Sequence, residues 1–167
     1  MALPKAATTN PATPRATHNP FDDLAAIPPA GGDFPELRLG DYIVVIDDIY
    51  PKTTSKAVNV WVCEYHAEGP DPDSDNPGPS PAGSCGSTVW STSAKSKPFA
   101  VTDLLEICGI DTNDKQAAAS FQRDLPAIMQ AQLNRVETTG ASGEVYSANC
   151  LVGSRVRLSI RPPKPSY

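Results

Sequence analysis

The sequence is poor in the side chains on which most enzymes depend. It contains only two histidines, His18 and His66. It has no Gly-rich phosphate loop, no Gly-x-Ser-x-Gly motif and no His-Glu-x-x-His motif. A histidine general base is restricted to His66, because His18 lies in a Pro-rich segment. We therefore expect a non-enzymatic protein. An enzyme that uses His66 with Cys63 is a third alternative, for which no orienting partner is visible.

Long apolar runs are also missing. No segment approaches the roughly 18 apolar residues of a membrane-spanning helix. The first residues, 1–5, lack the apolar core of a secretory signal. We expect a soluble protein that is made in a cytoplasm and has no membrane partner.

The four cysteines show no close pairing, so free thiols are expected rather than a disulfide framework. Cys63 and His66 have Cys-x-x-His spacing, and Cys85 could complete a zinc site. Structural zinc sites usually offer two tight ligand pairs, and only one is present here. The acids at 71–75 lack the glycine and glutamate of a calcium loop. We expect no metal and no cofactor.

Proline divides the chain into a body and its flanks. Most of the 18 prolines fall before residue 36, in a Pro/Gly/Asp loop at 67–84 and in a tail at 162–167. Residues 1–35 are predicted to form an extended arm, because proline disfavours both helix and strand ladder. The single domain is expected at 36–161, with a core large enough for a small barrel or sandwich.

Residues 36–161 contain both strand-like and helix-like patterns of hydrophobic residues. Runs rich in β-branched and aromatic residues predict strands, and an i, i+3, i+4, i+7 apolar pattern predicts a helical insertion at 98–136. The expected fold is mainly β, a five-stranded Greek-key barrel of the oligonucleotide-binding type, with a β-sandwich as the alternative. The strands are expected at 42–50, 58–65, 87–92, 144–146 and 155–161.

The last of these strands has two different faces. Val156, Leu158 and Ile160 alternate with Arg155, Arg157 and Arg161, and side chains on a strand alternate with a period of two. The chain as a whole carries a formal net charge of −5. A cationic sheet face in an acidic protein indicates an anionic partner, of which the nucleic-acid backbone is the commonest, although a solvated charged face is the simpler interpretation.

Aromatic residues accompany the basic ones. On the second strand the sequence was interpreted with Val58, Val60 and Val62 facing the core and with Trp61 and Tyr65 facing outward. Rings on a sheet can stack bases while lysine and arginine follow the phosphates. The alternative is that each ring fills the core. The predicted nucleic-acid site comprises Trp61, Tyr65, Trp90, Lys52, Lys56, Lys95, Lys97, Arg155 and Arg157.

Four short motifs resemble the single-stranded-DNA-binding proteins of tailed bacteriophages. They are 19–22 (Asn-Pro-Phe-Asp), 40–42 (Gly-Asp-Tyr) before a Val/Ile-rich strand, the Lys-Thr loop with the second strand, and 151–156 after a helix that ends in Cys-Gly-Ile. The resemblance implies an oligonucleotide-binding fold, single-stranded DNA as partner and a location in the host bacterial cytoplasm. The acidic C-terminal tail of many such proteins is missing, and the 67–84 loop and the second helix are additional.

A structural protein of the virion is the alternative function. Pro-rich arms lose less entropy than flexible chains when they become ordered on a neighbour. A capsid decoration or cement protein could use 1–35 and 67–84 to clamp capsid protein and copies of itself. With either function we expect a homo-oligomer.

Overall fold

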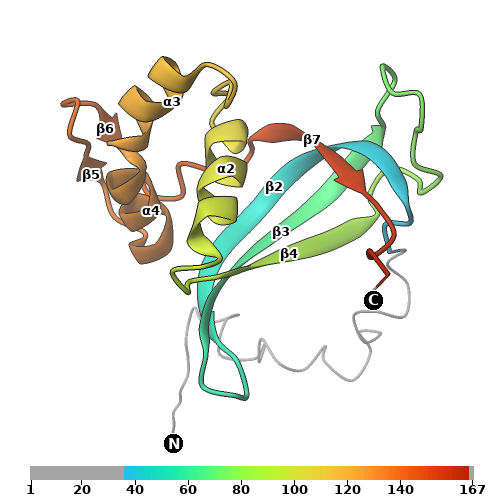
Figure 1. Cartoon of the computed structure of the whole chain (residues 1–167), viewed down its shortest axis with the longest axis horizontal. Helices are drawn as coiled ribbons and strands as arrows, with labels where there is room; N and C mark the ends of the chain where they lie inside the picture. The colour runs from blue at the N-terminus through green and yellow to red at the C-terminus, as the bar shows by residue number, and fades with distance from the viewer. Residues whose placement is uncertain (1–35, 166–167) are drawn as a thin grey trace, which may run out of the picture. The chain divides into compact units, whose positions relative to one another are not determined.

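The computed structural model describes residues 36–165, and the predicted arm at 1–35 lies outside this part. The described chain is mainly sheet with three helices (Figure 1). The mainly β class with a helical insertion is therefore confirmed. The elements follow the order β2 (Gly40–Thr53), β3 (Asn59–Pro70), β4 (Cys85–Ser91), α2 (Lys97–Ile107), α3 (Lys115–Gln122), α4 (Leu125–Asn134), β5 (Thr138–Thr139), β6 (Val145–Tyr146) and β7 (Arg155–Ile160).

The long strands β2 and β3 form the frame of the main sheet. They pair antiparallel from Tyr42 opposite Pro70 to Thr53 opposite Asn59, with irregularities between Ile43 and Val44 and between Ile46 and Asp48. Such irregularities bend a strand and increase its twist. The two strands curve together beyond the rest of the sheet and end in a tight turn (Figure 1).

The main sheet has four antiparallel strands in the order β4-β3-β2-β7. Strand β7 follows the helices and pairs with the first half of β2, from Gly40 to Val45. β5 and β6 form a separate two-stranded sheet. Within residues 36–165 no closed barrel is found, so the predicted five-stranded barrel is not formed.

Helices α2 and α4 pack against the main sheet, α3 packs against α2, and the bounds of all three helices follow local signals. Pro98 and Pro126 occupy the first turns of α2 and α4, where the missing N–H costs nothing. Asp114 caps α3 by accepting a hydrogen bond from the N–H of Ala117. α3 ends at Gln122 and α4 begins at Leu125, so the chain breaks between these two helices just before Pro126.

The core face of β3 is the opposite of the predicted one. Cys63, Tyr65 and Ala67 belong to the main hydrophobic cluster, together with residues of β2, β4, α2 and α4. Val60 and Val62 are also buried, but they lie on the other face, outside that cluster. The strand has apolar side chains on both faces, so alternation alone could not tell which face the helices cover.

None of the helices in the described range is long and apolar enough to cross a membrane.

Candidate nucleic-acid interface

The predicted alternation on β7 is confirmed. Arg155 and Arg157 of β7 and Arg161, the residue that follows it, are exposed, and Val156, Leu158 and Ile160 are half-buried on the core side. Each arginine, however, is paired with acid from its own chain. The ion pairs join Arg155 to Glu68 at 2.8 Å, Arg157 to Asp71 at 3.1 Å and to Asp73 at 2.5 Å, and Arg161 to Asp41 at 2.6 Å. Arg155 and Arg157 are thus already neutralised.

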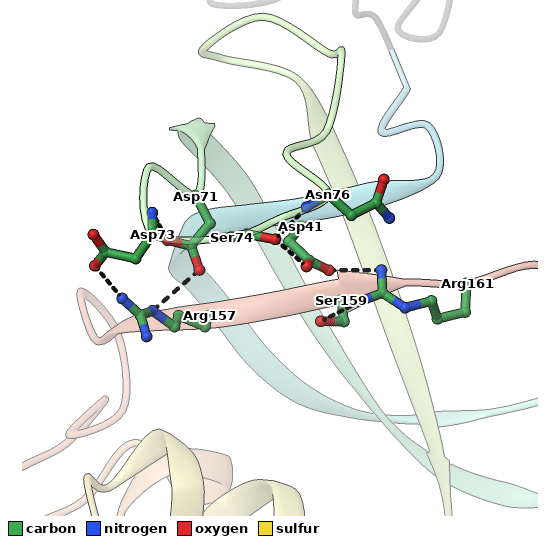
Figure 2. A network of polar contacts seen from close by, with 8 residues as sticks. All are labelled: Asp41, Asp71, Asp73, Ser74, Asn76, Arg157, Ser159 and Arg161. Atoms are coloured by element: carbon green, nitrogen blue, oxygen red, sulfur yellow. Dashed lines mark hydrogen bonds and ion pairs between the residues drawn. The ribbon is translucent and has the colours of Figure 1, made fainter.

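The two ion pairs of Arg157 hold the long loop against β7, and the Arg161–Asp41 pair joins the residue after β7 to β2 (Figure 2). The carboxylate of Asp41 also accepts a hydrogen bond of 2.5 Å from the Ser74 hydroxyl. The main chain of Asp41 accepts from the N–H groups of Asp71 and Gly78 and donates to the carbonyl of Asn76. The 67–84 segment is therefore bound to its own strands β2 and β7, with its first residues continuing β3.

A close approach of Gly78 to Tyr42 completes the anchoring. A Cβ at Gly78 would lie 1.9 Å from the Tyr42 ring, so only glycine fits there. The Tyr42 hydroxyl is fully buried, accepts from the Ser80 N–H and donates to the Arg38 carbonyl. Tyr42 therefore belongs to the core and at the same time anchors the loop.

The Arg161 guanidinium, with the hydroxyls of Ser74 and Ser159, holds the pKa of Asp41 well below its usual range. A carboxylate with a lowered pKa in the folded state stabilises the fold above its unfolded pKa of 3.8, and this stabilisation is lost as the pH falls towards the folded pKa. We therefore expect the denaturant midpoint of the wild type to fall between about pH 5 and about pH 2, and the Asp41→Asn variant to lose less over that interval. Circular dichroism at each pH measures the midpoint.

Asp75→Asn is the matched control. Asp75 lies in the same loop, is exposed and takes part in no ion pair among the residues described. Its variant should keep the acid sensitivity of the wild type. If Asp41→Asn also keeps it, the contacts of the Asp41 carboxylate with Arg161 and Ser74 do not stabilise the fold in solution.

Two of the three predicted stacking rings are buried, which corrects that prediction. Tyr65 is 7% exposed and Trp90 is 6% exposed. The Tyr65 hydroxyl lies 3.2 Å from the Thr88 hydroxyl, and the Trp90 indole N–H donates to Asp103 at 2.7 Å. With their polar atoms satisfied internally, both rings complete the core under α2 and present no face on which a base could stack.

Trp61 alone of the three reaches the surface. It is half-buried, packs on the edge of the core cluster and lines an open cleft with Pro51, Lys52 and Thr92. The cleft lies where the β2–β3 ribbon leaves the main sheet, beside the last residue pairs of β3 and β4. It therefore joins a partly exposed indole to a lysine.

The four predicted lysines share this end of the sheet. Lys52 lies at the end of β2 and Lys56 in the turn after it. Lys95 lies in the connection between β4 and α2, and Lys97 is the first residue of α2. This connection begins opposite Asn59, where the Thr92 hydroxyl donates a hydrogen bond to the Asn59 carbonyl. All four are exposed, and the ion pairs among residues 36–165 include no lysine.

The two ends of the sheet also differ in their charged residues. Residues 49–63 and 91–102 contain these four lysines and no aspartate or glutamate. Arg155 lies opposite Val45, seven residues from Lys52 along β2, which is roughly 20 Å on a strand. The lysines and Trp61 therefore form one group, and Arg155 and Arg157 belong to another.

The sequence analysis missed one exposed ring, Phe99. It lies on the first turn of α2, two residues after Lys97, and is 73% exposed. The helical stripe of Val101, Leu104 and Leu105 leaves Phe99 out. An aromatic residue outside the stripe of an amphipathic helix was the available signal.

The residues considered for zinc do not gather. Cys63 is buried on the core face, where burial raises the pKa of its thiol to about 12. His66 lies on the opposite face and pairs with Asp47 at 2.7 Å, while Cys85 is exposed. Among residues 36–165 no three histidine, cysteine or acidic side chains are arranged to hold a metal ion.

The chain matches no protein-family model, and no curated protein or solved structure matches it either. The interpretation of the site therefore rests on the residues and their geometry.

Proposed function

We propose that this protein binds single-stranded nucleic acid, with single-stranded DNA as the natural partner, through the basic end of its sheet. The interface comprises Lys52, Lys56, Lys95, Lys97 and the exposed part of Trp61. The observation that carries the proposal is that all four lysines are exposed on elements at the same end of the sheet, in segments that contain no acid. Unpaired lysines follow phosphates without reading sequence, so little sequence preference is expected.

The strand order supports the same proposal. A fourth strand that returns beside the first, outside a three-stranded meander, is the arrangement of a Greek key. In oligonucleotide-binding folds, the loop between the first two strands is one of the contact regions. Here that loop carries Lys56 and follows Lys52 directly. The open sheet is thus compatible with a relative of that fold that lacks the closing strand.

A titration of labelled oligo-dT tests the proposal. Fluorescence anisotropy should rise with protein concentration at low salt, and the affinity should fall steeply as salt is added. Four phosphate contacts on a single strand correspond to a slope of about −3 in log K against log salt. An absence of binding at low salt, or an affinity that does not depend on salt, would contradict the proposal.

A structural role in a virus particle is the second candidate, and the edges of the sheet favour it. β4 and β7 each pair on one side only within the described residues, apart from a single bridge between Glu36 and Cys85. Open edges invite pairing with another chain. The loop at 67–84 argues against the clamp hypothesis, because it is bound to its own sheet. Mass spectrometry of purified particles decides: many copies would support this role, and absence would exclude it.

A further inference from the structure

Phe99 is exposed without a packing role. It has the largest exposed fraction, 73%, among the large hydrophobic residues that the structure leaves exposed in residues 36–165. It belongs neither to the main hydrophobic cluster nor to the partly buried residues that pack against it. Ala100, Leu104 and Leu105 of the same helix are buried. The contacts of the fold therefore do not require an aromatic ring at this position.

Its surroundings are those of an anion-binding surface. Phe99 follows Lys95 and Lys97 closely on the chain. The same connection contacts the start of β3 through the hydrogen bond from Thr92 to Asn59, two residues before Trp61. An exposed ring among lysines is the combination by which proteins bind single strands, because the rings stack bases and the cations hold phosphates.

We propose that Phe99 is a base-stacking residue of the interface and that, with Trp61, it makes the site selective for unpaired bases. This inference rests on the proposed function and adds a requirement on the ligand, which must expose the face of at least one base. Binding to lysines alone does not have this requirement. A row of lysines binds any phosphate backbone, whereas a stacking ring needs the free face of a base. The bases of a duplex are stacked on each other and offer no such face.

The test compares oligo-dT with an abasic strand of the same length and therefore the same number of phosphates. The wild type should bind oligo-dT at least about fivefold more tightly than the abasic strand, since one stacked base contributes that much or more. Phe99→Ala should weaken binding to oligo-dT by about fivefold and leave binding to the abasic strand unchanged. Phe99→Tyr, which keeps a ring, should retain the wild-type ratio.

Val145→Ala provides the matched control. Val145 is 54% exposed and lies in the separate two-stranded sheet, so removing it tests the loss of an exposed apolar side chain elsewhere. Its affinities should equal those of the wild type. Thermal unfolding of each variant shows that the fold is kept, as expected for exposed positions.

The outcomes separate this inference from the proposed function. Failure of the wild type to bind either strand at low salt refutes the proposed function, and the role of Phe99 with it. Equal binding of the wild type to both strands supports the lysine interface and refutes base stacking. A Phe99→Ala variant that keeps the wild-type preference for oligo-dT refutes the assignment of Phe99 while leaving the interface in place.

Discussion

Replacing Lys52, Lys56, Lys95 and Lys97 together by glutamate is expected to lower the affinity for single-stranded DNA by about a hundredfold or more at about 0.1 M salt. The loss arises because each phosphate contact releases counterions from the strand, and four contacts contribute between two and three powers of ten at that salt. The slope of log K against log salt should become shallower by about 3. Anisotropy titrations with oligo-dT at several salt concentrations measure both quantities.

Two double variants distinguish the effect of lysine position on affinity from the effect of net charge. Lys52→Glu with Lys95→Glu changes the net charge by the same amount as Lys115→Glu with Arg123→Glu. The latter two residues are exposed at or beside α3, outside the two lysine segments. We expect the first pair to weaken binding by about tenfold or more and the second pair to change it by less than about threefold. Equal losses for both pairs would mean that general attraction, and not a site, binds the strand.

Gln132→Leu is expected to lower the free energy of unfolding by about 2–4 kcal/mol. Gln132 is fully buried on α4, where its side-chain amide donates to the Ile49 carbonyl at 3.2 Å and accepts from the Leu151 N–H at 3.0 Å. Leucine fills a similar space but pairs with neither group, so a buried donor and a buried acceptor lose a partner. Denaturant unfolding followed by circular dichroism measures the change.

The same substitution at Gln130 is the control, because Gln130 is exposed on the same helix. Gln130→Leu should change the free energy of unfolding by less than about 0.5 kcal/mol. A Gln132→Leu variant as stable as the wild type would show that α4 is not bonded to β2 and to the segment before β7 in the way described.

Local patterns in the sequence predict much of the secondary structure. The run of β-branched residues at 42–50 lies inside β2, and the apolar stripe after Pro98 matches α2. These signals succeed because they depend on the residues of one element. Strand β5 has only two residues, Thr138 and Thr139, and so short a strand shows no periodicity in the sequence.

Which face of a strand packs against the main hydrophobic cluster could not be predicted in the same way. On β3, both Val62 and Cys63 are apolar and buried, and only the position of α2 and α4 decides which of them faces the main cluster. Tyr65, predicted to face outward from the alternation on this strand, lies inward for this reason. Amphipathic alternation loses its information when a strand is apolar on both sides.

The arginine strand shows the effect of long-range contacts. The alternation on β7 correctly predicts three exposed arginines, but the acids that pair with them come from residues 84 to 120 positions earlier in the sequence. No local pattern reveals that Asp71, Asp73 and Asp41 would neutralise this face. The four lysines are exposed, and the structure separates them from the arginines with which the sequence grouped them.

A two-dimensional amide NMR titration of the labelled protein with oligo-dT tests the location of the interface most directly. The shifts should concentrate in residues 52–61 and 91–99, and adding salt should reverse them. Shifts concentrated in residues 155–161 and 67–84, or no shifts at low salt, would contradict the account.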